Sequence, residues 1–268
     1  MRKPGFDRPG LSKSRQKTSV IILKSDDEIK KIALASKIVA EILRLLETMI
    51  KPGVTTKEVE QYVEKIIKER NGVPAFKGYK GYPSSLCTSI NHEVVHGIPS
   101  KKRVLKDGDI ISIDVGVVYR GFIGDAARTY PVGNVSEATK RLLRVAEDSL
   151  YKGIEKACQN NRVSDISHAI QNYVEKNGYS VVRNFVGHGV GKSLHEEPQI
   201  PNYGQPNKGP LLRKGMVLAI EPMVNAGTSD VVIMNDGWTA VTTDGMPSAH
   251  FEHTVVVTDD KPQILTRL

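Results

Sequence analysis

The hydrophobic pattern of the chain predicts four helices and at least two long strands. Residues 26–49 carry apolar side chains at helical spacing, and Ser25 followed by Glu28 forms the capping-box pattern of a helix start. Further helices are expected over residues 56–70, 137–159 and 164–177. Strands are expected over residues 109–119 and 125–132, and mostly strands and turns follow residue 177. This mixture predicts an α/β (α+β) fold.

Two short motifs of the first half return in the second half in the same order. Residues 61–65 (QYVEK) are echoed by residues 172–176 (NYVEK), at an offset of 111. Residues 104–108 (VLKDG) are echoed by residues 211–215 (LLRKG), at an offset of 107. An apolar strand that ends in an acid follows each copy of the second motif. Two matches at nearly equal offsets favour a duplicated α/β unit over a chance echo, with one site shared between the halves.

Five potential metal ligands stand at the ends of apolar, strand-like runs or between glycines: Asp114, Asp125, His188, Glu221 and Glu252. Each of them alone could be a turn residue or an ordinary strand-end acid. Together, four carboxylates and an imidazole carry too much negative charge to be buried without cations. A set without thiolate suits Mn²⁺, Fe²⁺, Co²⁺ or Zn²⁺, in a pair that shares bridging carboxylates. The pattern therefore indicates hydrolysis at a two-metal site.

Two further histidines are framed by turn residues and are candidates for catalytic roles. His96 lies in VHGIP and His195 in LHEEP. Both could be plain turn residues, or neutral hydrogen-bonding partners of a scissile amide and its developing oxyanion. The remaining histidines lack such a setting and are expected to be surface or structural residues: His92, His168, His250 and His253.

Composition and charge set the organisation of the chain and exclude several classes of protein. The 268 residues carry a net charge of +8, much of it within residues 1–24, which also contain prolines and glycines. We expect an unpacked basic extension over residues 1–24 and a single domain over residues 25–268. The extension is either a solvated arm or a contact to ribosomal RNA, without sequence-specific nucleic-acid binding. No apolar run suits a membrane span or a secretory signal, and Cys87 and Cys158 suggest no disulfide framework, so a cytoplasmic location is expected.

Seven segments together resemble the type I methionine aminopeptidases, from about residue 25 to the end of the chain: residues 89–91, 96–99, 109–115, 187–191, 195–198, 221–222 and 251–254. The resemblance implies the "pita-bread" fold, a pseudo-twofold duplication with a central curved, mainly antiparallel sheet covered by helices. The 33 residues from His188 to Glu221 leave no room for the large insertion of the type II enzymes.

The resemblance implies a role for each of the residues above. Asp114 would chelate one metal ion, Asp125 and Glu252 would bridge both, and His188 and Glu221 would complete the other site. The two ions would be Co, Mn, Fe, Ni or Zn. A hydroxide held by them would attack the carbonyl carbon of an initiator methionine, in nascent or newly made polypeptides whose second residue is small. Glu221 would shuttle the proton, His195 would hold the oxyanion, and His96 would lie near the substrate amide.

The resemblance also implies a methionine pocket lined by Tyr79, Tyr82, Cys87 and Trp238. Two positions depart from several bacterial relatives, since Phe76 replaces a cysteine and Leu194 replaces a phenylalanine, although both keep the lining apolar. Asn91 and Ser248 match positions that are linked to a monovalent cation in relatives.

Two other functions use the same fold. Xaa-Pro aminopeptidases and prolidases share the five metal ligands but usually carry an additional N-terminal domain. A non-catalytic pita-bread protein that binds ribosomes through the basic extension would be expected to have lost ligands, and all five are present. We expect a monomeric methionine aminopeptidase.

Overall fold

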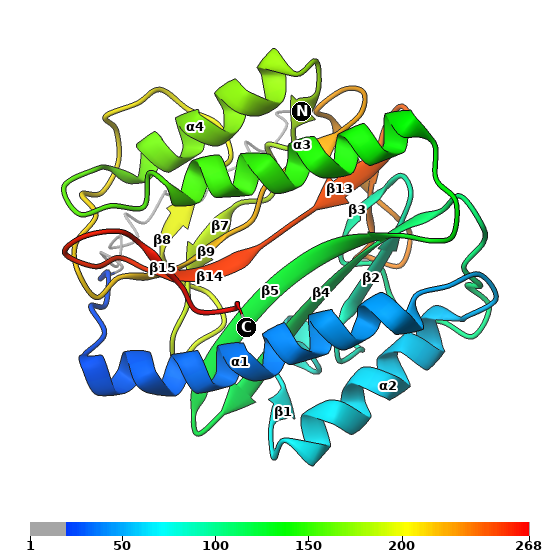
Figure 1. Cartoon of the computed structure of the whole chain (residues 1–268), viewed down its shortest axis with the longest axis horizontal. Coiled ribbons are helices and arrows are strands. Elements are labelled where there is room, and N and C mark those ends of the chain that lie inside the picture. Colours follow the sequence, from blue (N-terminus) through cyan, green and yellow to red (C-terminus); the bar gives the residue numbers. More distant parts are fainter. Residues whose placement is uncertain (1–19, 268) are drawn as a thin grey trace, which may run out of the picture.

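Each half of the molecule contributes one pair of helices, and the strands lie between the two pairs (Figure 1). The structure is a computed structural model that describes residues 20–267. The helices are α1 (Asp26–Met49), α2 (Thr56–Glu69), α3 (Glu137–Ile154) and α4 (Val163–Lys176). All four were predicted from the hydrophobic pattern, and only α3 ends clearly earlier than expected. The chain turns away there because Asn160 and Asn161 exchange backbone hydrogen bonds with Leu212.

Helix α1 begins where its capping residues predicted. The Ser25 hydroxyl accepts the Glu28 N–H at 3.3 Å, and the Glu28 carboxylate accepts the Ser25 N–H at 3.0 Å. Thr55 and Glu58 form the same reciprocal pair at the start of α2. These bonds satisfy donors that a helix start leaves free, so each helix has a defined first residue.

The strands are short except for one hairpin. They are β1 (Val73–Pro74), β2 (Cys87–Ile90), β3 (Glu93–Val95), β4 (Ile110–Tyr119), β5 (Phe122–Pro131), β6 (Ser180–Val181), β7 (Gly187–Gly189), β8 (Glu196–Ile200), β9 (Val217–Ile220), β10 (Met223–Asn225), β11 (Val231–Ile233), β12 (Ala240–Thr242), β13 (Ser248–His250), β14 (His253–Val256) and β15 (Gln263–Ile264). A short 3₁₀ turn covers Tyr79–Gly81. The long hairpin joins β4 to β5 through a turn in which Arg120 and Gly121 have positive φ, so β5 starts before the predicted residue 125.

Every strand pairing between residues 20 and 267 is antiparallel. The pairings divide into four sheets, of which the largest has the order β15-β14-β9-β7-β8 and belongs to the second half. In the first half, β4 pairs with β1, β2 and β5. The expected pita-bread architecture of helices over mainly antiparallel strands is confirmed.

Matching backbone contacts in the two halves show the duplication directly. An isolated bridge joins Thr55 to Val104 in the first half, and another joins Arg162 to Leu211 in the second half, at an offset of 107. The starts of α2 and α4 differ by the same 107 residues. The sequence echo at an offset of 111 therefore lies on equivalent helices but is displaced by four residues, about one helical turn, which keeps it on the same helix face.

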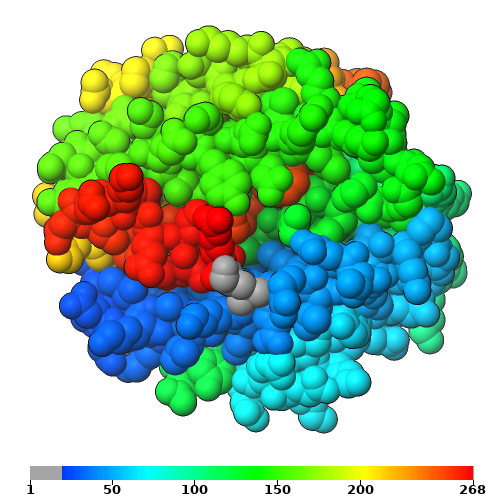
Figure 2. Space-filling model, in the orientation of Figure 1, coloured from blue at the N-terminus to red at the C-terminus, as the bar shows by residue number. Residues whose placement is uncertain are grey.

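Each half has its own core, and a third apolar cluster lies between them. The first core gathers residues such as Ile42, Leu46, Val63, Ile111 and Ile113. The second core gathers residues such as Leu142, Leu150, Ile166, Ile170 and Leu218. Backbone bonds cross the seam, for example from the Glu252 N–H to the Ala127 carbonyl at 2.8 Å. Figure 2 shows α1 in blue and α3 in green on either side of this seam, with the C-terminal segment in red along part of it.

The predicted N-terminal extension is described only from residue 20 onward, and its residues 1–19 lie outside the described residues. Within residues 20–24, Ile21 and Lys24 pack against the second half, whereas an unpacked extension was expected up to residue 24. The Lys24 N–H donates to the Gly215 carbonyl at 2.7 Å, and the Lys24 side chain is buried. None of the helices in the described part of the chain has the length and hydropathy of a membrane span.

Candidate metal centre

The hairpin of β4 and β5 places two carboxylates side by side. Asp114 pairs with Ala127, and Asp125 lies two residues before Ala127 on the same strand. Because side chains two positions apart point to the same face of a sheet, both carboxylates project from one face. Their sequence separation therefore becomes a short distance in space.

The second half supplies the other three predicted ligands. His188 on β7 pairs with Ala219 on β9, and Glu221 follows the end of β9. Glu252 lies between β13 and β14. The His188 Nε2 atom is 3.3 Å from Glu221 Oε1 and 3.9 Å from Asp125 Oδ2. Potential ligand atoms of Asp125, His188 and Glu252 all lie within 4.8 Å of one another.

All the predicted site residues border one cavity of about 320 Å³ at the junction of the halves. Its lining includes the five predicted ligands, the two candidate histidines and the predicted pocket residues: Asp114, Asp125, His188, Glu221, Glu252, His96, His195, Tyr79, Tyr82, Cys87 and Trp238. The structure thus brings together residues that span most of the chain. This proximity does not by itself assign a role to any of them.

The carboxyl groups of the cluster are unfavourable without a counter-charge. Burial raises the pKa of Asp114 to about 7, from an ordinary value of 3.8. Burial also raises the pKa values of Asp125, Glu221 and Glu252, and neighbouring carboxyls add to the rise at Asp125 and Glu252. Within residues 20–267, one buried oxygen each of Asp114, Asp125 and Glu252 has no hydrogen-bond partner. Such orphaned acceptors fit divalent cations, because these ions take carboxylate oxygens as ligands.

The imidazole of His188 is held in the form that a metal ligand requires. Its Nδ1 atom is 2.9 Å from the Gly189 carbonyl, so the ring proton sits on Nδ1 and donates to that oxygen. The lone pair of Nε2 then faces Glu221 and Asp125. Burial lowers the pKa of His188 to about 3, and His195 lowers it further, so the ring is neutral at physiological pH. A neutral, oriented ring fits the metal-ligand prediction.

The other two histidines lie at the edge of the cluster. The ring centroid of His195 is 4.3 Å from that of His188, and its Nδ1 atom is 2.7 Å from the Tyr79 hydroxyl. One side of His195 is open to the cavity, yet burial of the rest lowers its pKa to about 4, with Lys80 adding to the effect. Burial likewise lowers the pKa of His96 to about 4. Both rings are neutral at pH 7, as catalytic hydrogen-bonding partners should be.

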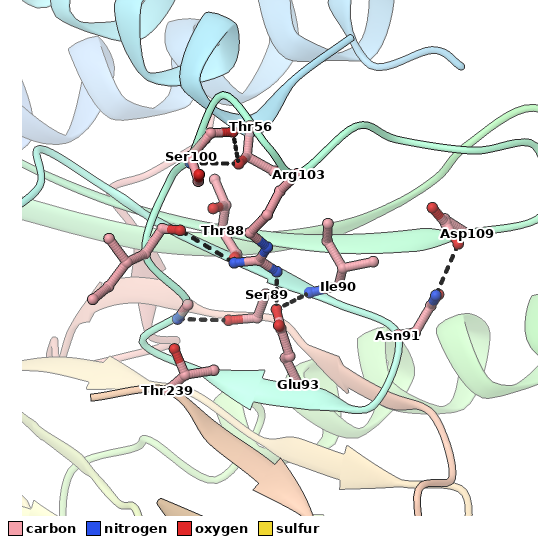
Figure 3. A network of polar contacts seen from close by, with 12 residues as sticks. Thr56, Thr88, Ser89, Ile90, Asn91, Glu93, Ser100, Arg103, Asp109 and Thr239 are labelled. Atoms are coloured by element: carbon pink, nitrogen blue, oxygen red, sulfur yellow. Dashed lines mark hydrogen bonds and ion pairs between the residues drawn. The ribbon is translucent and has the colours of Figure 1, made fainter. Parts of the chain in front are cut away.

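A polar network holds the loop that carries His96, which has a positive φ of 62°. Figure 3 shows Arg103 reaching across this loop. Its guanidinium donates to the carbonyls of Thr88 and Ile98, each at 3.2 Å, and pairs with Glu93. The two carbonyls flank His96 on either side in the sequence. The network therefore fixes the backbone from which the His96 ring projects.

The cavity also has an apolar end, formed by a buried cluster with the aromatic residues. Tyr82 packs edge-on against Trp238, with ring centroids 5.1 Å apart, and its hydroxyl donates to the Gly97 carbonyl at 3.0 Å. Phe76 and Leu194 are both buried here and keep the lining apolar. The cavity therefore has an apolar end next to the carboxylates.

One cavity residue had no candidate role in the sequence analysis. His250, expected to be a surface or structural residue, is buried in the cavity wall and so is not at the surface, and its Nε2 atom is 3.6 Å from Glu221 Oε2. Its position two residues before Glu252 was an available signal, since residues two apart in an extended run face the same side. Phe185 and Met223 also line the cavity, and no local motif marked them.

Comparison with known proteins agrees with this geometry. A profile of metallopeptidase family M24 matches residues 30–259. The chain is 55% identical over 247 residues to a methionine aminopeptidase of Clostridium acetobutylicum, covering 92% of this chain and 99% of that one. It is 56% identical over 249 residues to methionine aminopeptidase 1 of Bacillus subtilis, covering 93% and 100%.

Solved structures separate the two enzyme alternatives by coverage. The crystal structure of a methionine aminopeptidase from Thermotoga maritima matches with a TM-score of 0.92 and 52% identity, over 93% of this chain and 100% of that chain. The crystal structure of a prolidase from Pyrococcus horikoshii matches with a TM-score of 0.75 and 27% identity, over 92% of this chain but 64% of that chain. The chain belongs to metallopeptidase family M24 and, within it, to the methionine aminopeptidases.

Proposed function

We propose that this enzyme removes the initiator methionine from nascent or newly made polypeptides whose second residue is small, with two divalent metal ions in its carboxylate cluster. The observation that carries the proposal is the pairing of orphaned, buried carboxyl oxygens with an adjoining apolar slot. A dinuclear site suits the former, and a methionine side chain suits the latter. The names of the similar proteins point to the same activity.

The five clustered residues would hold the ions. Asp114, Asp125, His188, Glu221 and Glu252 would supply the carboxylate and imidazole donors, and ligand atoms of Asp125, His188 and Glu252 already lie within 4.8 Å of one another. When bound, the ions supply Lewis acidity, which lowers the pKa of water and polarises a carbonyl oxygen. Glu221, at the end of β9 beside His188, would accept a proton from the attacking water and pass it to the leaving amine.

His195 would donate a hydrogen bond to the oxygen that becomes negative in the transition state. The Tyr79 hydroxyl lies 2.7 Å from Nδ1 and can donate to it. A neutral ring that accepts at Nδ1 carries its proton on Nε2, which is the donor this role needs. His96, at the cavity wall, would hydrogen-bond near the amide of the scissile bond.

Two further proposals concern a monovalent cation and contact with the ribosome. Asn91 and Ser248 are adjacent, since the Ser248 N–H donates to the Asn91 carbonyl at 2.9 Å, and a monovalent cation is proposed near them. Contact with the ribosome is proposed through the basic residues of the first 24, on the charge of the sequence alone.

Hydrolysis of Met-Ala-Ser by metal-stripped protein, titrated with Mn²⁺, Fe²⁺, Co²⁺ and Zn²⁺, tests the proposal. We expect release of methionine that depends on metal and saturates near two ions per chain. Xaa-Pro dipeptides, assayed with the same preparation, should be poor substrates. Equal or faster cleavage of the Xaa-Pro peptides would reassign the enzyme to the prolidase-like alternative, and absence of hydrolysis with every metal would favour a non-catalytic role.

A further inference from the structure

A second groove, of about 440 Å³, opens beside the catalytic cavity. Four residues line both spaces: Lys80, Val186, His188 and His195. The groove is therefore continuous with the site of the reaction. Any substrate longer than the cavity has a direct path into it.

The outer wall of the groove is the segment that precedes α1. Val20 and Ile22 line it, with 75% and 52% of their surfaces exposed. Exposed aliphatic side chains at the mouth of a site are candidates for contact with a ligand. These two belong to the part of the chain that was expected to be an unpacked arm.

A buried ion pair fixes this wall in place. Lys24 Nζ is 2.5 Å from Glu196 Oε2, and the two side chains are only 4% and 9% exposed. The same ammonium group donates to the Ile22 carbonyl at 3.0 Å. Glu196 directly follows His195, and its other oxygen accepts the Ser193 N–H at 3.1 Å. The wall is thus tied to the loop that carries a candidate catalytic residue.

Strand β8 also contributes to the groove. Glu197 and Gln199 line it, and because they are two residues apart on the strand they project from the same face. The groove therefore combines aliphatic side chains from residues 20–22 with polar side chains from β8, a lining that suits a peptide with both backbone amides and apolar side chains.

We propose that this groove binds the third to fifth residues of the substrate polypeptide and favours aliphatic side chains there. The proposal rests on the aminopeptidase activity proposed above and deepens it by naming a substrate class. An extended chain advances about 3.4 Å per residue, so the three residues after the small second residue cover about 10 Å, the scale of a neighbouring groove. Partial burial of one aliphatic side chain corresponds to about a fivefold change in kcat/KM.

Selectivity between two peptides tests the groove. The peptides are Met-Ala-Leu-Val-Ser and Met-Ala-Ser-Ser-Ser, and the measured quantity is the ratio of their kcat/KM values with Mn²⁺-loaded, full-length enzyme. We expect a ratio of about 5 to 20 for the unaltered chain. The double variant Val20→Ser/Ile22→Ser should bring the ratio close to one. The matched control is Val73→Ser, at a valine that is 60% exposed on β1 and lines neither space, and it should keep the original ratio.

The other outcomes overturn the proposal in distinguishable ways. A ratio near one in the unaltered chain, or a high ratio that survives in the double variant, would exclude the groove as a subsite. A preference that appears only after deletion of residues 1–19 would assign the groove to the chain's own N-terminal residues. Failure of the unaltered enzyme to cleave Met-Ala-Ser with any metal would overturn the aminopeptidase activity itself, and the groove proposal with it. Thermal melting of each variant shows that its fold is retained.

Discussion

The hydroxyl of Tyr79 lies 2.7 Å from Nδ1 of His195, and we expect it to set the proton position on that ring. In Tyr79→Phe the ring keeps its packing but loses the donor to Nδ1, so the neutral imidazole can adopt the tautomer that places no proton on Nε2. We expect kcat for Met-Ala-Ser to fall about tenfold, equivalent to about 1.4 kcal/mol, with metal content unchanged. Tyr62→Phe, at a tyrosine outside the cavity, is the control. An unaltered kcat would remove Tyr79 from the positioning of His195.

The charge of Asp125 should matter more for metal binding than for folding. Asp125→Asn should lower the bound metal to at most one ion per chain and reduce turnover by more than about 100-fold. The metal-free variant should melt no lower than the metal-free parent at pH 8, since burial and the nearby Asp114 and Glu221 already disfavour the charge. Mass-spectrometric metal analysis and calorimetry provide the two readouts. Asp260→Asn, at an exposed aspartate, should change neither.

At the scale of residues, the sequence predicted which side chains come together around the cavity, and the reason is chemical. An acid that follows an apolar run is costly to bury unless it has a partner, so Asp114, which lies within β4, and Glu221, which follows β9, could be identified locally. His250 had only its position two residues before Glu252 as a local signal, and its burial depends on the pairing of β13 with β10. The individual roles of the gathered residues stay predictions until the variants are measured.

At the scale of elements, Arg103 holds together the chain that runs from β2 through β3 to Ile98, because it donates to the carbonyls of Thr88 and Ile98. Arg103→Met would leave Glu93, with a side chain only 14% exposed, without its cation. We expect the free energy of unfolding to fall by about 2–4 kcal/mol and kcat to fall about tenfold, because His96 loses its fixed backbone. Urea denaturation and Met-Ala-Ser kinetics measure the two effects.

A second substitution separates stability from positioning. In Arg103→Met/Glu93→Met no charge is left uncompensated, so most of the lost stability should return while kcat stays low. Recovery of both would mean that the network contributes only stability. Arg128→Met breaks an ion pair with Glu47 whose partners are 41% and 47% exposed, and it should cost less than about 1 kcal/mol.

The helices and the two long strands could be predicted because their signals are local. Capping residues and apolar periodicity lie within the segments themselves, whereas the turn at Arg120 and Gly121 was not predicted, and β5 was expected to start at residue 125. The strands of the second half are mostly two to five residues long, too short to show alternation, and their existence depends on partners far along the chain. Residues 20–24 were predicted to belong to an unpacked extension because the partners of Lys24, Glu196 and Gly215, are distant in the sequence.

The whole molecule is a duplication whose halves each hold part of the metal cluster. Asp114 and Asp125 come from the first half, and His188, Glu221 and Glu252 come from the second. The offset of 107 that relates the bridges also relates Asp114 to Glu221. Bound metal should therefore stabilise the seam between the halves as well as the site, because an ion that binds only the folded state adds to its stability.

That linkage gives the metal effect a defined dependence on pH. In the metal-free protein, Asp114 has a pKa of about 7 against an ordinary 3.8, so the folded state binds more protons than the unfolded state between these values. The additional proton on Asp114 stabilises the folded state relative to higher pH. This stabilisation is complete below pH 3.8 and is lost as the pH rises through 7. The raised pKa values of Asp125, Glu221 and Glu252 act in the same direction.

The histidines act in the opposite direction but at lower pH. The pKa values of His96, His188 and His195 are lowered to about 4, 3 and 4, so their contribution is complete above pH 6.5 and is lost only as the pH falls below it. Between pH 6.5 and 8 these three histidines are neutral, and the buried carboxyls of the same cavity are the groups whose proton binding changes there. Metal competes with their protons, so the rise in Tm on adding Mn²⁺ should grow across this interval. Differential scanning calorimetry at pH 6.5, 7.2 and 8.0, with and without Mn²⁺, measures this rise. In Asp114→Asn the rise in Tm on adding Mn²⁺ should depend less on pH. An equal rise at all three pH values in the unaltered chain would show that the buried carboxyls do not exchange protons for metal.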